Sequence, residues 1–234
     1  MSLAENIARV QNRIAAAALR SGRKVEEITL LAVSKTFPAE QIRAAHDAGL
    51  RVFGENRVQE FAGKIAALRD LADAQWHMIG HLQTNKAAQA VELFSHIDSV
   101  DSVRLARKLN SAASDLGKKL VALIEINLGG EVAKSGLAPG SPEFKNLLDA
   151  APELPSLDFR GLMTVPPYSD DPAHSRPHFR RMRELFHHIA ARRLPAVHLE
   201  VLSMGMSHDF EVAIEEGATC VRVGTAIFGA RNIL

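Results

Sequence analysis

The most reactive position that the sequence suggests is Lys35, which directly follows the apolar run Leu30–Ser34 (LLAVS). A lysine at the end of a buried strand loses hydration, and desolvation lowers the pKa of an amine toward neutrality. The neutral amine is the nucleophile that forms Schiff bases with carbonyl compounds. Position alone leaves an alternative open, in which the stem lies on apolar surface and the charge reaches solvent.

Two later segments are rich in small hydrogen-bond donors. The first contains Ser203, Gly205 and Ser207, and the second contains Gly224 and Thr225. Glycines let backbone N–H groups approach an anion closely, and hydroxyl groups add hydrogen bonds. Each segment by itself is equally compatible with helix caps and turns. Together with an inward-pointing lysine, the two segments predict a site for a phosphorylated carbonyl compound.

Two histidine pairs are weak candidates for metal sites. His77 and His81 have the i, i+4 spacing of a zinc-binding helix, but they lack the accompanying glutamate and fall on a predicted strand. His174 and His178 lie in a segment rich in proline and aspartate, and the sequence suggests no third ligand for them. We therefore predict no metal site.

Short apolar strands alternate with helices along the chain. The predicted strands are Thr29–Ser34, Arg51–Gly54, Trp76–Gly80, His96–Val100, Leu120–Asn127, Phe159–Thr164, His198–Leu202 and Thr219–Val223. The predicted helices are Ala39–Ala48, Val58–Leu71, Asn85–Leu93, Ser102–Leu116, Glu143–Ala150, Pro177–Arg192, Asp209–Glu216 and Ala226–Ala230. This alternation indicates parallel β–α–β units with strands buried on both faces. We predict an α/β fold, a single (β/α)8 barrel over residues 1–234 whose active site lies at the carboxyl ends of the strands; an open doubly wound sheet is the alternative.

An extra helix is predicted before the first strand. Leu3, Ile7, Val10 and Ile14 form an apolar stripe with helical spacing, and Gly22 ends the helix. The same segment has several arginines and one acid, which is also a feature of organelle presequences. The periodicity favours a structural helix.

Composition and charge exclude several classes of protein. The 28 Lys and Arg residues and 27 Asp and Glu residues leave a net charge of +1, so there is no global positive field for nucleic acid. Arg180, Arg181 and Arg183 are expected on a solvated helix face. No apolar run approaches the roughly 20 residues that a membrane span needs. The single cysteine, Cys220, fits a reducing compartment, so we expect a cytoplasmic chain with Cys220 as an inert core residue.

Seven segments of the chain carry a family resemblance: LLAVSKTFPAEQI, FGENRVQE, WHMIGHLQTNK, INLGGEVAKSG, RGLMTVPP, LSMGMSHDFEVAIEEGA and VRVGTAIFGAR. In this order, over nearly the whole chain, they resemble the pyridoxal phosphate homeostasis proteins, single-domain relatives of the N-terminal barrel of alanine racemase. The resemblance implies that the chain binds pyridoxal 5′-phosphate (PLP). It further implies a role in intracellular vitamin B6 homeostasis, without established catalytic turnover.

The resemblance also implies roles for particular residues. Lys35 would hold PLP as an internal aldimine. The implied phosphate contacts are Ser203, Gly224 and Thr225, with the backbone of Met204 and Gly205 nearby. The implied ring contacts are Arg222, which would face the pyridine nitrogen, and Asn56 and His77, which would line the ring pocket. The implied partners are PLP and apo forms of PLP-dependent enzymes, with no nucleic acid and no membrane.

The sequence differs from some relatives at Phe37, where they carry a second lysine. Lys134 is a second candidate for an amine that accepts PLP, and the alternative is that it is an ordinary surface lysine.

An amino-acid racemase of the alanine racemase type is the main alternative function. The charge of Arg222 disfavours a protonated pyridine, and the only tyrosine, Tyr168, lies after the sixth strand. A carrier is therefore favoured. A Schiff-base aldolase acting on a sugar phosphate, and a scaffold with a vestigial pocket, remain as further alternatives.

Overall fold

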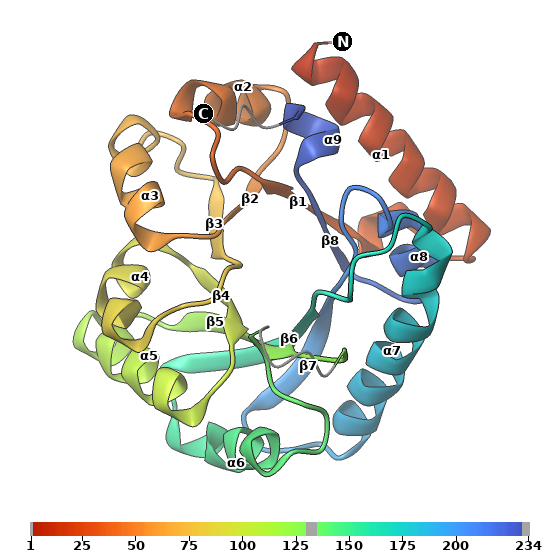
Figure 1. The fold of residues 1–234 in the computed structure, drawn as a ribbon. Helices are drawn as coiled ribbons and strands as arrows, with labels where there is room; N and C mark the ends of the chain where they lie inside the picture. Colours follow the sequence, from red (N-terminus) through yellow and green to blue (C-terminus); the bar gives the residue numbers. More distant parts are fainter. Residues whose placement is uncertain (1, 130–134, 231–234) are drawn as a thin grey trace.

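The computed structural model describes residues 2–129 and 135–230, which form a barrel surrounded by helices (Figure 1). The strands are β1 (Thr29–Val33), β2 (Val52–Glu55), β3 (Gln75–Met78), β4 (His96–Val100), β5 (Leu120–Ile126), β6 (Leu157–Thr164), β7 (Val197–Ser203) and β8 (Cys220–Val223). The α-helices are α1 (Leu3–Arg20), α2 (Ala39–Asp47), α3 (Val58–Lys64), α4 (Ala87–Leu93), α5 (Val103–Asp115), α6 (Pro142–Ala150), α7 (Arg176–Ala191), α8 (Phe210–Glu215) and α9 (Thr225–Phe228). Short 3₁₀ segments lie at Val25–Glu27, Ile65–Ala67, Thr84–Lys86, Ala151–Glu153 and Pro172–Ser175.

All eight strands pair in parallel in sequence order, and β1 also pairs with β8. The register places Thr29 opposite Cys220 and Leu31 opposite Arg222. This pairing closes the sheet, which confirms the predicted (β/α)8 barrel and excludes the open sheet. No helix in the described part of the chain is long and apolar enough to cross a membrane.

The N-terminal helix α1 begins at a capping box between Ser2 and Glu5, in which each side chain accepts a hydrogen bond from the other residue's N–H. The helix lies against α8 and α9 (Figure 1). Asn6 adds a long-range link, because its side-chain amide donates to the Ile227 carbonyl at 3.0 Å. The helix predicted from the apolar stripe is therefore present, and it supports the segment that begins with Thr225.

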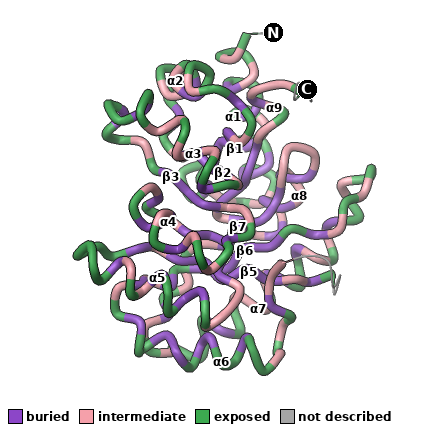
Figure 2. The backbone as a smooth tube through the Cα atoms, turned by 60° about the vertical axis from the view of Figure 1, so that its left-hand side comes forward, coloured by how far each residue is buried: buried purple, intermediate pink, exposed green. Residues whose placement is uncertain are grey.

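Apolar side chains fill the space between the barrel and its helices. Phe53 of β2 stacks on Trp76 of β3, and Phe61 of α3 packs on the same indole, with centroid distances of 5.2 and 4.9 Å. A separate small cluster, built around Leu31, Val33 and Cys220, lies inside the barrel. Figure 2 shows burial concentrated along the strands and exposure along the outer helices.

Two local predictions differ from the structure. The helix predicted over residues 58–71 ends at Lys64, and a 3₁₀ turn follows it. The arginines of α7 are not a purely solvated face, because Arg180 and Arg183 both pair with Glu216, at 3.2 and 3.3 Å. Glu216 is almost fully buried at the end of α8, so it needs cationic partners.

Candidate functional site

A cavity of about 930 Å³ opens at the carboxyl ends of the strands, where (β/α)8 barrels have their active sites. The predicted site residues that line it are Lys35, Asn56, Arg222, Gly224 and Thr225. Lys35 and Asn56 follow β1 and β2, and the other three lie on or after β8. Because β8, β1 and β2 are neighbours in the barrel, these residues share one side of the cavity.

Lys35 is half-buried, and the backbone on both sides of it is anchored. Ser34 is fully buried and donates its hydroxyl to Glu55 at 2.7 Å. Thr36 has a φ of +68°, a left-handed conformation that is strained for a β-branched residue. The Thr36 N–H donates to a carboxylate oxygen of Glu60 at 2.5 Å. Acidic side chains from β2 and α3 therefore fix the backbone that carries Lys35.

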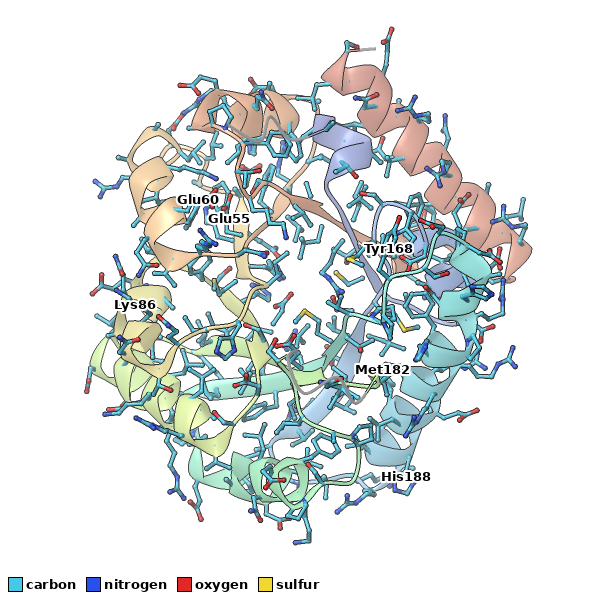
Figure 3. The ribbon with its side chains drawn as sticks, in the orientation of Figure 1. Glu55, Glu60, Lys86, Tyr168, Met182 and His188 are labelled. Atoms are coloured by element: carbon cyan, nitrogen blue, oxygen red, sulfur yellow. The ribbon has the colours of Figure 1, made fainter. Side chains whose placement is uncertain are left out.

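Lys64 forms ion pairs with both of these acids. Lys64 Nζ lies 3.3 Å from Glu55 and 2.5 Å from Glu60, and it also donates to the Ser34 carbonyl at 3.3 Å. Burial raises the pKa of the Glu55 carboxyl, and the charge of Lys64 opposes that rise. Figure 3 shows Glu55 and Glu60 close together beside α3. We refer to Glu55, Glu60 and Lys64 as the acid–lysine network.

On the β8 side, a serine of the β7–α8 loop reaches the predicted anion-binding segment. Ser207 Oγ accepts hydrogen bonds from the N–H groups of Gly224 (3.2 Å) and Ala226 (3.4 Å), and Ser207 lines the cavity. Ser203 is fully buried, and its hydroxyl accepts from Arg222 at 2.7 Å. The serine placed at the cavity wall is therefore Ser207, while Ser203 lies behind it.

Met204 and Gly205 also lie behind the cavity wall. Met204 is buried in the main core, and its N–H donates to the Cys220 carbonyl at 3.1 Å. The Gly205 carbonyl accepts from the Arg222 N–H at 3.0 Å. These bonds continue the β7–β8 pairing and fix the loop that carries Ser207.

Gly205→Ala is expected to destabilise the fold by about 2 kcal/mol more than Gly229→Ala. The two glycines have φ values of +93° and +91°, so both substitutions place an alanine at a positive φ. A Cβ at Gly205 would lie 2.5 Å from Ala213 Cβ, whereas Gly229 faces open space. Urea unfolding of the two variants measures the difference. An equal loss in the free energy of unfolding in both variants would contradict the role of the contact with Ala213.

Arg222 places a positive charge beneath the β8 side of the cavity. Its Nη1 donates to Ser203 Oγ and its Nη2 donates to the Thr164 carbonyl, both at 2.7 Å. Burial lowers the pKa of this guanidinium, but arginine remains protonated in proteins. Both acceptors are neutral, so neither cancels the charge that Arg222 presents to the cavity.

His77 lies deeper in the barrel and is not among the residues lining the cavity. Its ring stacks on His96 with centroids 3.9 Å apart, and its Nδ1 lies 3.0 Å from an Asp98 carboxylate oxygen. Burial lowers the pKa of His96 to about 4. Among residues 2–129 and 135–230, no group of three or more His, Cys, Asp or Glu side chains is arranged to hold a metal ion.

The wall opposite Lys35 contains an acid that was not predicted from the sequence, Glu125 of β5. Glu125 is 7% exposed and lines the cavity. Its Oε1 accepts from the Ser135 hydroxyl at 2.9 Å, and its Oε2 is buried with no hydrogen-bond partner among the described residues. Burial raises the pKa of this carboxyl. In the sequence, Glu125 is noticeable as an acid in an otherwise apolar strand, because acidic side chains are rarely buried unless they are paired.

Glu125→Gln is expected to stabilise the protein, and more at pH 8.5 than at pH 5. The carboxyl has a raised pKa in the folded state, so its ionisation opposes folding increasingly as the pH rises above the unfolded-state pKa. Glutamine cannot ionise, and its amide oxygen can still accept from Ser135. Urea unfolding at the two pH values measures this, and a gain that is the same at both would contradict a raised pKa.

Tyr168 lies at the entrance of the cavity, in the segment between β6 and α7. It is 73% exposed, and its ring packs on His208 with centroids 5.1 Å apart. Its hydroxyl donates to Asp170 at 3.1 Å, and this hydrogen bond raises the pKa of the phenol. Figure 3 places Tyr168 across the barrel mouth from Glu55 and Glu60.

Three other positions that the sequence raised lie outside the cavity lining or outside the described residues. Cys220 is buried, and burial raises the pKa of its thiol to about 12, which is typical of an unreactive cysteine. Phe37, at the position where some relatives carry a lysine, is buried and stacks on Phe228 with centroids 4.9 Å apart. Lys134 lies outside the described residues.

The chain is similar to known proteins over nearly its whole length. The family model for the alanine racemase N-terminal domain covers residues 2–232. A curated relative from Aquifex aeolicus, named pyridoxal phosphate homeostasis protein, is 47% identical over 99% of this chain and 100% of its own length.

Solved structures agree with this match. PipY of Synechococcus elongatus, solved with PLP bound, is 38% identical with a TM-score of 0.83, and the match covers 97% of this chain and 100% of that one. Alanine racemase from Streptomyces coelicolor is 21% identical with a TM-score of 0.70, and the match covers 95% of this chain and 58% of that one. The second likeness concerns the fold alone.

Proposed function

The chain belongs to the pyridoxal phosphate homeostasis protein family, and from this premise we propose that it binds PLP covalently at Lys35 and serves in vitamin B6 homeostasis. PLP supplies an aldehyde that condenses reversibly with a primary amine. The observation that carries the proposal is a half-buried lysine in the same cavity as a buried guanidinium and a glycine–hydroxyl segment.

The cavity has a size that suits PLP, and its lining residues have chemistry that suits PLP. The cavity of about 930 Å³ is within the range of small-molecule sites. We propose that Gly224, Thr225 and Ser207 hold the phosphate, with Ser203, Met204 and Gly205 supporting them from behind. The Gly224 backbone packs closely on β1, because a Cβ there would lie 3.3 Å from Val33. This close packing brings the proposed phosphate and amine positions near each other.

The other proposed contacts concern the ring. Arg222 is proposed to face the pyridine nitrogen, and Asn56 is proposed to line the ring pocket. His77 is too deep for direct contact with the cavity, so we propose that it supports the floor through its stack on His96. All of these residues belong to one barrel, which we propose is a single PLP-binding domain over residues 1–234.

A carrier fits the site better than a racemase. A fixed positive charge at Arg222 disfavours protonation of the pyridine nitrogen and thus weakens its ability to stabilise a carbanion. The Tyr168 hydroxyl donates to Asp170, which keeps the phenol protonated and unsuited to act as a base. We propose a cytoplasmic protein whose recipients are apo forms of PLP-dependent enzymes.

The proposal is tested by transferring the cofactor. Protein loaded with PLP and desalted is mixed with an apo-transaminase, and recovery of transaminase activity is followed. We expect the loaded protein to restore activity, and borohydride-reduced protein, whose cofactor is fixed, to restore none. An apo-enzyme that recovers with free PLP but not with the loaded protein would overturn the carrier role.

Deuterium exchange separates the carrier from the racemase. L-Alanine is incubated in D₂O with loaded protein or with the same concentration of free PLP. We expect no α-deuteration beyond that of free PLP. Incorporation that exceeds it and disappears in Lys35→Ala would favour the racemase.

A further inference from the structure

The cavity has a second polar side that the proposed cofactor contacts do not use. The proposed PLP contacts come from β8, β1, β2 and the β7–α8 loop, whereas Glu125 and Ser135 lie on and after β5. In a closed barrel of strands in sequence order, β5 lies opposite β1. A ligand on the β5 side would therefore face Lys35 across the cavity.

Glu125 defines the chemistry of this side. One carboxylate oxygen is satisfied by Ser135, and the other is buried and lacks a hydrogen-bond partner among the described residues. Leaving a buried carboxylate oxygen unpaired is costly, and a cationic donor removes that cost. The charge of Arg222 also acts on this carboxyl, but its two Nη atoms donate to Ser203 and Thr164 instead.

Other charged groups act on Glu125 from a greater distance. Asp101 raises its pKa, while Arg222 and His81 lower it, and burial is larger than any of these effects. His81 is itself hydrogen-bonded to Asp101 at 3.1 Å. Glu125 Oε2 thus remains a buried acceptor that a ligand entering on the β5 side could use.

We propose that the β5 side of the cavity binds primary ammonium compounds, and that Glu125 holds the ammonium group and accepts its proton. This inference rests on the proposed covalent attachment of PLP at Lys35. A primary ammonium matches the site because it can donate to the unpaired oxygen and, once deprotonated, can react where Lys35 is bonded. A tertiary ammonium can donate to the unpaired oxygen but cannot react in this way, and a quaternary ammonium can do neither.

The proton and bond changes balance without any further reactant. Two N–H bonds of the ammonium break in turn. The first proton moves to Glu125 Oε2, and the amine nitrogen then forms a bond to the carbon attached to Lys35 Nζ. The second proton moves from the amine nitrogen to Nζ, Glu125 gives its proton to Nζ, and the bond from the carbon to Nζ breaks. Lys35 leaves as a neutral amine, Glu125 is again a carboxylate, and the new C=N nitrogen keeps the third hydrogen and the positive charge. The result is release of the cofactor as an adduct of the incoming amine.

Binding is tested on protein whose cofactor cannot be exchanged. Loaded protein is reduced with borohydride and titrated calorimetrically with methylammonium chloride, with tetramethylammonium chloride as the probe that lacks N–H donors. We expect saturable binding of methylammonium, binding at least about tenfold weaker in Glu125→Gln, and no change in Glu153→Gln. Glu153 is a suitable control because it is an exposed acid that pairs with the surface residue Arg107 and does not line the cavity.

Release is tested on unreduced protein. Methylamine at pH 8 should release the cofactor at a rate that saturates with amine concentration and that falls at least about tenfold in Glu125→Gln. Equal binding and release in wild type and Glu125→Gln, or equal binding of tetramethylammonium, would overturn the inference. A peptide map of the reduced protein separates the two proposals: no adduct at Lys35 refutes the PLP site, whereas an adduct without methylammonium binding refutes only the β5 site.

Discussion

Lys35→Ala is expected to abolish covalent retention of PLP and to weaken its binding by at least about a hundredfold, or nearly 3 kcal/mol. The substitution removes the only bond to the cofactor that is covalent in our proposal, while the phosphate and ring contacts remain. Equilibrium dialysis measures the affinity, and the visible absorbance band of the bound cofactor reports the covalent link.

Lys145→Ala provides the matched control for this experiment. Lys145 is an exposed lysine on the outer helix α6, where it pairs with Asp149 at 2.5 Å, and it does not line the cavity. Its replacement is expected to leave both the absorbance band and the affinity unchanged. A Lys35→Ala protein that keeps the band and the affinity of the wild type would refute the role of Lys35.

Lys64→Met is expected to destabilise the protein by about 3–5 kcal/mol at pH 8, the cost of removing one partner of a buried ion pair. Glu55 is fully buried, and without Lys64 its carboxylate would have no counter-charge within the acid–lysine network. The pKa of Glu55 is already raised by burial, and loss of Lys64 raises it further. The destabilisation should therefore shrink as the pH falls and Glu55 takes up a proton.

Urea unfolding at pH 8 and pH 5 measures this effect, and two further variants interpret it. Glu55→Gln combined with Lys64→Met removes the buried charge and should recover much of the lost stability at pH 8. Lys145→Met breaks an exposed i, i+4 pair and should cost no more than about 0.5 kcal/mol. A double variant no more stable than Lys64→Met alone would show that the buried charge of Glu55 is not the cause. Because the network also holds the backbone at Ser34 and Thr36, Lys64→Met should weaken PLP binding as well.

The barrel could be predicted because each of its units leaves a local pattern. Strands such as Leu120–Ile126 are almost continuously apolar, and glycines such as Gly49 and Gly117 follow the helices at positions with left-handed φ. The same pattern placed Lys35 near the carboxyl end of the first strand, where barrels have their active sites, and Lys35 does line the cavity.

How deeply each side chain lies, and whether it faces the cavity, could not be predicted in the same way. His77 was expected at the cavity, but it is not among the residues that line it, and its ring stacks on His96. Ser203 and Ser207 have the same chemistry, and only the path of the loop decides that Ser207 faces the cavity. Lys64 has the pattern of a surface helix residue, and its partner Glu55 is identified only when α3 packs on β2.

The most direct test of PLP attachment at Lys35 is borohydride reduction of the native protein followed by peptide mass mapping. Reduction fixes any Schiff base as a stable secondary amine, so the modified peptide identifies the reacting lysine without assumptions about function. We expect a single pyridoxyl adduct on Lys35. An adduct on a different lysine, or none at all, would contradict it.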